Sequence, residues 1–480
     1  MHPNLLNRRT FLRDTGVGIG ATALAGLLAR DAAASASPSA GGAALLGGLP
    51  GLPHFAPKAK RVIFLCMAGG PSHLESFDNK PKLTELSGQP MPESITAGQP
   101  IAQLQGTELI AHGAMTRFKR YGQSGLEVSD FFPHTARLAD DITVIKSMVT
   151  EQINHDPAHT FMNTGTAISG RPSMGSWVNY GLGSECDNLP GFVVLMSHSG
   201  RNPQPLSSRQ WSAGFLPGRH QGVPFNATGD VVHYVGNPPG VDRQSQRRLI
   251  DRVTQLDAHR NQQTANPAID SRIAAYELAF RMQASVPTLA DCSDEPRSVL
   301  EKYGATPGDG TFASNCLLAR RLAERGVRFI QLYHKGWDHH GGLKNNMTIS
   351  AGSTDRPCWA LVDDLKSRGL LDDTLVIWGG EFGRTPMVQN KGSEGIGRDH
   401  HIKGFTMWMA GGGVKPGVSY GATDDFGYHA TENPVHVRDL HATMLALLGV
   451  DHARFAVKHQ GLDLKLTGVE PARVVREVLA

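Results

Sequence analysis

Short apolar strands alternate with amphipathic helices along much of this 480-residue chain. In residues 312–334 a helical pattern ends at Gly326 and is followed at once by an apolar segment, and the order helix, glycine, strand returns in residues 361–378. Such alternation predicts an α/β fold with a doubly wound, mostly parallel sheet and helices on both of its faces. In folds of this class, ligands bind beyond the carboxyl ends of the strands.

Other segments extend this pattern over residues 58–480, where we expect one catalytic domain. Residues 241–285 carry apolar positions at helical spacing among many charged and amide side chains, which predicts a solvated helical insertion. Further strands are expected at 61–67, 141–148, 191–197 and 405–412, and a final helix at 439–450.

The first 57 residues have the composition of a targeting segment and a linker. Arg8 and Arg9 precede a weakly hydrophobic run at 16–28, and small residues follow. This order predicts a twin-arginine signal peptide over residues 1–36, recognised by the twin-arginine export machinery, and a periplasmic or extracellular protein. Residues 37–57, rich in Ser, Gly, Ala and Pro, predict a flexible linker. No second run approaches 18 apolar residues, so no stable membrane anchor is expected.

Charge and cysteine content exclude several classes of protein. The chain has 47 basic and 44 acidic residues, a formal net charge of +3, without a basic stripe. A nucleic-acid partner is therefore not expected. Five cysteines without Cys-x-x-Cys spacing argue against a zinc ribbon and against a full disulfide framework.

Histidines and carboxylates gather where the predicted strands end. One such histidine is usually solvated or part of a core, but five clusters at one edge of a sheet indicate a shared ligand. Mixed carboxylate and imidazole ligands suit zinc, manganese or iron better than magnesium or calcium alone. The clusters are Ser72, His73, Glu75 and Asp78; His155, Asp156 and His159; Asp338, His339 and His340; Glu381 and Arg384; and Asp399, His400 and His401.

His155 is expected just before the N-terminus of a helix. Asp156 can cap this helix, and Pro157 is tolerated in its first turn. Because helix N-termini attract anions, we expect an oxyanion beside His155, and the Arg384 guanidinium could bind the same oxyanion. Two simpler interpretations stay open: Asp156 is a plain cap with His155 and His159 at the surface, or Arg384 is a structural tether.

Several longer motifs resemble a known family of exported bacterial proteins, described as domain of unknown function 1501 and related to sulfatases within the alkaline phosphatase superfamily. The resemblance extends from Lys58 onward and rests on GGPSHLESFD, NHDPAHTFMNTG, GGEFGRTP and GRDHHIKGFTMWMAGGGVKPG. It implies an alkaline phosphatase/sulfatase-like fold and a metal-dependent hydrolase of sulfate or phosphate esters, borne by a small molecule or a polysaccharide. It also implies two divalent metal ions, zinc, manganese or calcium, that bracket the ester.

The resemblance further implies which side chains hold each metal. In the superfamily, an Asp/His pair and a later histidine hold one metal; an early carboxylate, the nucleophile and a second acidic loop hold the other. The first set is Asp338, His340 and His400, with Asp399 beside it; the second is His73 or Asp78, His155 and Glu381.

Three positions depart from the superfamily pattern. No Asp follows the first strand directly, Phe382 follows Glu381 where a histidine is usual, and His155 stands where a Ser, Thr or Cys nucleophile is expected. The Cys/Ser-x-Pro-x-Arg string needed for formylglycine formation is also missing from this loop. The ester would then be attacked by a metal-bound hydroxide or by His155, with Arg384 as the second catalytic residue, or His155 is one more ligand.

A function of a different class stays open. The missing nucleophile is compatible with a non-catalytic metal- or ligand-binding or assembly protein on the same scaffold. A phosphomutase ranks last, because it would need a phosphoserine or a second large domain inserted between the metal loops, and neither is visible in the sequence.

Overall fold

The computed structural model describes residues 47–480 except 100, 200–203, 227, 234 and 391. The predicted signal peptide and residues 37–46 of the predicted linker lie outside these described residues. The amide of Leu49 donates to the carbonyl of Gly181 (2.8 Å), and the amides of His54 and Phe55 donate to the carbonyl of Gly449 (2.8 and 3.2 Å). This part of the predicted linker is therefore bound to the domain and is not free.

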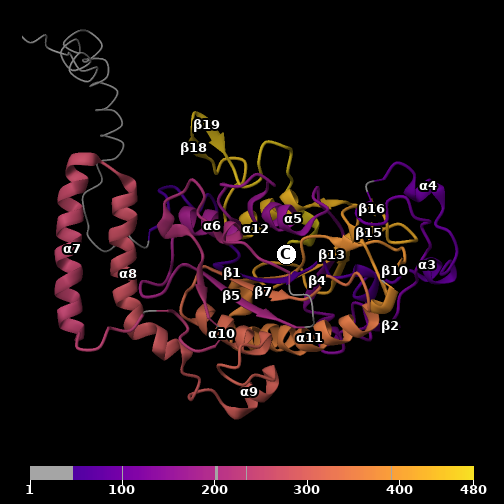
Figure 1. Cartoon of the computed structure of the whole chain (residues 1–480), viewed down its shortest axis with the longest axis horizontal. Coiled ribbons are helices and arrows are strands. Elements are labelled where there is room, and N and C mark those ends of the chain that lie inside the picture. Colours follow the sequence, from indigo (N-terminus) through magenta and orange to yellow (C-terminus); the bar gives the residue numbers. More distant parts are fainter. Residues whose placement is uncertain (1–46, 100, 200–203, 227, 234, 391) are drawn as a thin grey trace, which may run out of the picture. The chain divides into compact units, whose positions relative to one another are not determined.

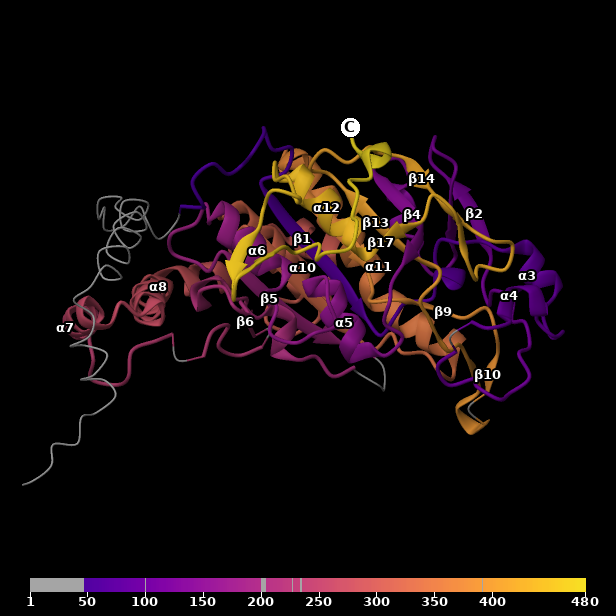
Figure 2. The same cartoon turned by 90° about the horizontal axis from the view of Figure 1, so that it is seen from above.

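A nine-stranded sheet forms the centre of the domain. Its order is β14–β4–β13–β8–β1–β7–β5–β6, with β17 also paired to β4. All neighbours are parallel except that β13 is antiparallel to both β4 and β8. Figure 2 shows β5 and β6 on one side of β1 and β4 and β14 on the other. The strands are β1 Arg61–Ala68, β4 Ile142–Val149, β5 Phe192–His198, β6 Val223–Phe225, β7 Phe329–Lys335, β8 Thr374–Gly379, β13 Phe405–Ala410, β14 Val418–Tyr420 and β17 Val435–His436.

Helices cover both faces of the sheet (Figure 1). Every residue of β1 is buried, and its side chains alternate between the faces. Ile63 and Leu65 pack with side chains of α10 and α11, whereas Phe64 and Cys66 pack with side chains of α5, α6 and α12. The predicted doubly wound α/β fold is confirmed. The helices of one face are α9 Arg297–Tyr303, α10 Phe312–Glu324 and α11 Leu343–Ser367; those of the other are α5 His155–Thr164, α6 Met174–Leu182 and α12 Val437–Leu447.

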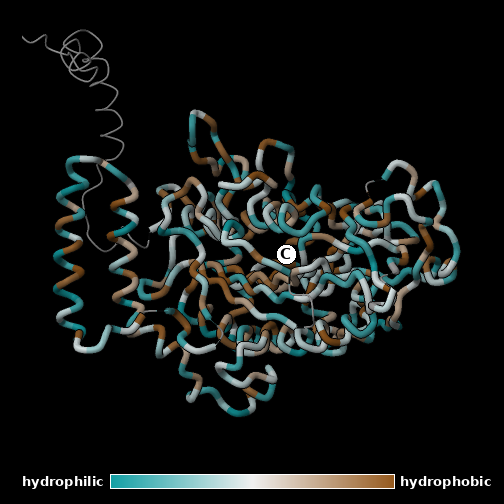
Figure 3. Tube along the Cα trace, viewed as in Figure 1, coloured by the Kyte–Doolittle hydropathy of each residue, from teal (hydrophilic) through white to brown (hydrophobic). Residues whose placement is uncertain are grey.

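The predicted helical insertion consists of two long helices, α7 Arg243–Thr264 and α8 Pro267–Ala290, which lie side by side at one end of the sheet (Figure 1). An ion pair joins them, with Nη1 of Arg247 donating to Oε2 of Glu277 at 2.8 Å. Figure 3 shows that α7 is largely hydrophilic, in contrast to the central strands. None of the described helices combines the length and apolar character needed to cross a membrane.

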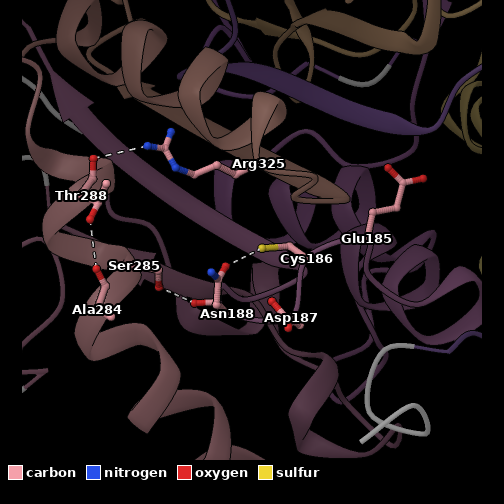
Figure 4. A pocket seen from close by; sticks show the side chains of 8 residues that line it. All are labelled: Glu185, Cys186, Asp187, Asn188, Ala284, Ser285, Thr288 and Arg325. Carbon is pink, nitrogen blue, oxygen red and sulfur yellow. Dashed lines mark hydrogen bonds between the residues drawn. The ribbon is translucent and has the colours of Figure 1, made fainter. Parts of the chain in front are cut away.

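Polar contacts attach α8 to the domain around a pocket of about 460 Å³ (Figure 4). The Ser285 hydroxyl donates to the carbonyl of Asn188 at 2.6 Å, and Nη2 of Arg325 donates to the carbonyl of Thr288 at 3.3 Å. Asn188 lies in the loop between α6 and β5, and Arg325 directly follows α10. The insertion is thus tied to the loop before β5 and to the end of α10.

Short elements line the edges of the domain. Five two-stranded sheets pair β2 with β3, β9 with β12, β10 with β11, β15 with β16, and β18 with β19. These elements are β2 Phe118–Tyr121, β3 Leu126–Ser129, β9 Gly383–Arg384, β10 Gln389–Asn390, β11 Ile396–Gly397, β12 His400–His401, β15 Ala422–Thr423, β16 Ala430–Glu432, β18 Val457–His459 and β19 Leu462–Leu464, with short helices α3 Pro81–Glu85 and α4 Glu93–Thr96.

Candidate metal centre

The strands β1, β4, β7 and β8 end at one edge of the sheet, because they run parallel to one another. The loops that carry His155, Asp338 and Glu381 follow β4, β7 and β8. His400 reaches the same edge by a different route: it precedes β13, and β13 is antiparallel to β4 and β8. An antiparallel strand begins where its neighbours end, so the GRDHH motif lies at the same edge although it follows no strand of the central sheet.

Four side chains converge there. His155, Asp338, His340 and His400 place one potential ligand atom each within 4.8 Å of one another, and we call them the four-ligand cluster. Oδ1 of Asp338 lies 2.9, 3.2 and 3.3 Å from Nε2 of His340, His155 and His400. For metal–ligand distances of about 2.0–2.1 Å, the edges of a tetrahedral zinc site are about 3.3 Å. The cluster therefore has the size of a metal centre, and it contains the predicted set Asp338, His340 and His400 together with His155.

The three histidines of the cluster share one orientation. Each directs Nδ1 at an oxygen atom that can only accept, so in the neutral ring Nδ1 carries the proton and Nε2 carries the lone pair. All three lone pairs thus face the cluster, as they do in metal sites, where a ligating histidine donates its other N–H to an outer oxygen. For His155, His340 and His400 the acceptors are, in order, Oε1 of Glu381 (2.6 Å), Oε1 of Gln389 and the carbonyl of Ile153 (2.7 Å).

Solvent reaches the cluster from one side. The side chains of His155, Asp338 and His340 are 13–14% exposed. Glu381 and His159, which lie behind His155, are fully buried. A ligand would therefore approach Asp338 and His340 directly.

Arg384 lies beneath Asp338 and is fully buried. Its Nη2 donates to Oδ1 of Asp338 at 2.6 Å, and its other donors reach the carbonyls of Gly70 (2.9 Å), Arg398 (3.1 Å) and Gly69. Because these contacts occupy the guanidinium, the prediction that Arg384 binds an oxyanion of the substrate is not supported. The geometry is that of a tether, which was the other interpretation of the sequence.

Electrostatics keep Asp338 and His400 in the protonation states that a cation requires, a carboxylate and a neutral imidazole. Burial raises the pKa of the Asp338 carboxyl, but the charge of Arg384 and the adjoining histidines outweigh burial and hold this pKa well below its usual range. Burial lowers the pKa of His400 to about 4, against the attraction of Asp338. Burial also lowers the pKa of His155, but the carboxylates of Asp338 and Glu381 raise it by more, so this pKa lies above its ordinary value.

A second group of possible ligands, His155, His159 and Glu381, lies directly behind the cluster. The amides of Gly69 and Gly70 donate to the Glu381 carboxylate at 3.0 and 3.2 Å. Burial raises the pKa of Glu381, but His159 and His155 lower it to about 2. Nε2 of His159 lies 3.3 Å from Oε1 of Glu381, and neither ring nitrogen of His159 has a hydrogen-bond partner within the described part of the chain.

His159 was named among the sequence clusters but not in the predicted metal sets. It follows His155 by four residues in α5, and residues at this spacing lie on one face of a helix. That spacing was the signal for its place beside Glu381. The helix itself begins at His155 with Asn154 as its N-cap, so Asp156 is not the cap; it forms an ion pair with Arg209 at 3.2 Å.

Three predicted metal ligands are used elsewhere. Nε2 of His73 donates to the carbonyl of Gly427 at 2.9 Å, and the Asp78 carboxylate pairs with Lys80 at 3.1 Å and accepts from the Thr423 hydroxyl. The carboxylate of Asp399 accepts from three backbone amides that belong to Gln103 (2.6 Å), Leu104 (3.0 Å) and His400 (2.8 Å). These contacts anchor loops around the rim, and none of the three side chains joins the four-ligand cluster.

Glu75 and His339, two further residues of the clusters seen in the sequence, contact neighbouring loops. Glu75 and Arg398 form a fully buried ion pair at 2.7 Å, and Arg398 also donates to the carbonyls of His112 and Gly113, both at 3.0 Å. Nε2 of His339 donates to the carbonyl of Gly336 at 3.0 Å. These residues connect loops and do not face the cluster.

Comparison with known proteins gives the following relatives. No curated protein matches the chain. Solved structures that resemble it include an alkaline phosphatase superfamily protein from Vibrio parahaemolyticus (11% identity, TM-score 0.33, 83% of this chain and 68% of that chain). They also include the PsFucS1 sulfatase from Pseudoalteromonas sp. (12%, TM-score 0.33, 82% and 68%) and the lipoteichoic acid synthase LtaP from Listeria monocytogenes (10%, TM-score 0.28, 84% and 76%). A family model described as "Protein of unknown function (DUF1501)" matches residues 59–479, and the chain therefore belongs to this family.

Proposed function

We propose that the protein is a metal-dependent hydrolase of sulfate or phosphate esters whose four-ligand cluster holds a divalent cation. The observation that supports this proposal is the convergence of three Nε2 lone pairs on one oxygen of Asp338. A divalent cation there would supply Lewis-acid stabilisation of the negative charge on the ester. Three imidazoles and one carboxylate suit zinc or manganese better than calcium, which takes oxygen ligands.

We assign one cation per chain, although the resemblance implied two. His155 directs Nε2 at the four-ligand cluster and donates its Nδ1–H to Glu381, so a second cation would have only Glu381 and His159 as ligands. In this assignment Glu381 orients His155 in the way that outer carboxylates orient metal-binding histidines. With both nitrogens engaged, His155 acts as a ligand and not as a nucleophile.

Other side chains hold the cluster in place and face the approaching ester. Nε2 of Gln204 donates to Oδ2 of Asp338 at 2.7 Å, which fixes the second oxygen of this carboxylate. Nε2 of Gln103 lies 3.3 Å from Nε2 of His340. Both amides therefore lie directly beside the cluster, where a bound sulfate or phosphate group would be.

The test is hydrolysis of an aryl sulfate and an aryl phosphate by protein loaded with zinc or manganese. His340→Ala removes one ligand and should abolish turnover and reduce bound metal together. His259→Ala, on the exposed face of α7, is the matched control and should keep both. Absence of turnover in every metal-loaded form of the unaltered protein would contradict the hydrolase proposal.

A specific observation favours a second candidate, a metal-dependent binding protein that does not turn over an ester. Among the described residues, no Ser, Thr or Cys side chain makes a hydrogen bond to His155, Asp338, His340 or His400. This candidate predicts binding of sulfate or phosphate by the metal-loaded protein, with no turnover in either the unaltered protein or His155→Ala.

A further inference from the structure

A pocket of about 240 Å³ lies at the end of α5 that is distant from the four-ligand cluster. The helix begins at His155, in the cluster, and ends at Thr164, in the wall of the pocket. Ten helical residues span about 15 Å, so α5 sets a fixed separation between the two sites. The loop after α5, β19 with the segment after it, and residues of α6 and α12 form most of the other walls.

Three half-buried cations line this pocket: Arg171, Arg438 and Lys465. Within the described part of the chain, Arg171 and Lys465 have no ion pair or side-chain hydrogen bond. Arg438 pairs with Glu151 through Nη1, but its Nε is buried and has no hydrogen-bond partner among the described residues. Donors in this state favour an anion, because an unpaired buried donor is costly and a charge-assisted hydrogen bond is strong.

The carboxylates of the pocket do not neutralise these cations. Asp463 and Glu470 lie in its wall, but both residues are exposed, whereas the three cations are half-buried. The three cations are therefore less exposed to solvent than the two carboxylates of the pocket.

Apolar groups complete the lining. Phe215 is half-buried in the wall, and the Arg171 guanidinium lies 6.0 Å from the centre of its ring. Ile168 and Val469, also in the wall, are 67% and 93% exposed. A sugar unit with an anionic substituent is complementary to this lining. Its apolar ring face can pack against the aromatic ring and apolar side chains, and its anion can pair with the cations.

Ion pairs and a hydrogen bond connect this pocket to the four-ligand cluster over the surface of α5. Arg209 pairs with Asp156, next to His155, and also donates to Oγ of Ser169, next to Ile168 in the wall of the pocket. The distances are 3.2 and 3.3 Å. On the other side, Arg438 pairs with Glu151, four residues before His155. Polar contacts on both sides of α5 thus link residues near His155 to residues of the pocket.

We infer that this pocket is a distal subsite for an anionic polysaccharide, which it holds while an ester on the same chain lies at the four-ligand cluster. The inference rests on the proposed function and names its substrate class: a polymer that carries sulfate or carboxylate groups, and not a small ester. A small ester would fill the cluster and leave the pocket without a role.

Binding measured by titration calorimetry tests this directly. The probes are a sulfated galactan hexasaccharide, a galacturonate hexasaccharide and a neutral galactan hexasaccharide. The unaltered protein should bind at least one anionic probe about tenfold more tightly than the neutral one, and Arg171→Gln/Lys465→Gln should lose about tenfold or more of that affinity. Comparison of the two anionic probes separates sulfate from carboxylate recognition.

The control is Arg252→Gln/Arg260→Gln, which makes the same charge change on exposed residues of α7 and should bind within about twofold of the unaltered protein. Lys465→Gln alone serves if the double variant unfolds, and should show a smaller loss in the same direction. Equal affinity for anionic and neutral probes, or equal affinity in the pocket variant and the control, overturns the inference.

The two hypotheses fail separately. If the pocket variant loses affinity but the unaltered protein hydrolyses no aryl or polysaccharide ester, the subsite stands and the hydrolase proposal falls. If the unaltered protein hydrolyses an aryl ester but the pocket variant binds the anionic probes normally, the hydrolase proposal stands and the subsite falls.

Discussion

Nε2 of His340 lies 2.9 Å from Nε2 of His400, and each ring donates its Nδ1–H to an oxygen on its other side. Two lone pairs therefore face each other at a distance where one of the nitrogens would ordinarily need a proton. The low pKa of His400, about 4 because of burial, disfavours that proton near neutral pH. A cation that accepts both lone pairs resolves this arrangement.

Removal of one ligand should sharply weaken metal binding. In His340→Ala the cluster keeps only His155, Asp338 and His400, and zinc affinity should fall by more than about 100-fold, since even outer-shell changes cost 10–100-fold. Competition with a chelating dye measures this affinity. His259→Ala should bind like the unaltered protein; equal zinc affinity in both variants would mean that His340 is no ligand.

Glu381 should act on the metal through His155. Glu381→Gln keeps the shape of the side chain but weakens the carboxylate contact to Nδ1 of His155, so affinity should fall by about 10–100-fold. Zinc titration and the thermal midpoint should be measured together, because a loss of affinity without loss of folding identifies a positioning effect. Unchanged affinity would indicate that His155 needs no such support.

Arg384 should contribute mainly to stability. Arg384→Met leaves the Asp338 carboxylate without its buried partner and frees four carbonyls, which should cost about 3 kcal/mol of unfolding free energy. Urea unfolding monitored by tryptophan fluorescence measures the change. A loss below about 1 kcal/mol would show that the tether is not needed for the fold.

Gly69 should be required because a side chain has no space there, and not only because its φ angle is positive. Its φ is 124°, and a Cβ there would lie 2.4 Å from the backbone nitrogen of Asp338. Gly69→Ala should therefore cost more than about 2 kcal/mol and reduce metal binding. Gly106 also has a positive φ (72°) but open space around it, so Gly106→Ala is the matched control. Equal losses in the two variants would assign the whole effect to backbone angle.

The Glu75–Arg398 pair should make stability depend on pH. Burial raises the pKa of Glu75, but Arg398 outweighs burial and lowers this pKa below its ordinary value. A group with a lowered pKa in the folded state stabilises the folded protein at pH values above its unfolded pKa of about 4.3. This stabilisation is lost as the pH falls through the folded-state pKa. Between pH 6 and 3 the unaltered protein should lose more unfolding free energy than Glu75→Gln. Parallel pH profiles would contradict this role.

The fold and much of the site follow from local sequence patterns. The strand at 61–67, the helix and strand of 312–334 and the rim positions of Asp338, His340 and Glu381 were all predicted, because periodicity and strand ends are local properties. The direction of β13 is set by pairing between strands distant in the sequence, and therefore the reason for His400's place at the rim could not be predicted.

Hydrogen-bond partners were the part that the sequence could not supply. His73 and Asp78 bind Gly427 and Thr423, roughly 350 residues away, and Arg384 binds backbone carbonyls, which no residue type reveals. A motif specifies a side chain but not which of its atoms are already engaged. His159 was the exception, because its helical spacing from His155 was visible in the sequence.

Metal stoichiometry tests the central claim most directly. After incubation with zinc or manganese and removal of free ions, mass spectrometry of the metal content should find about one equivalent per chain in the unaltered protein and less than about a tenth in Asp338→Ala. His259→Ala should retain about one equivalent. No bound metal in the unaltered protein, or the same content in Asp338→Ala, would contradict a metal centre formed by His155, Asp338, His340 and His400.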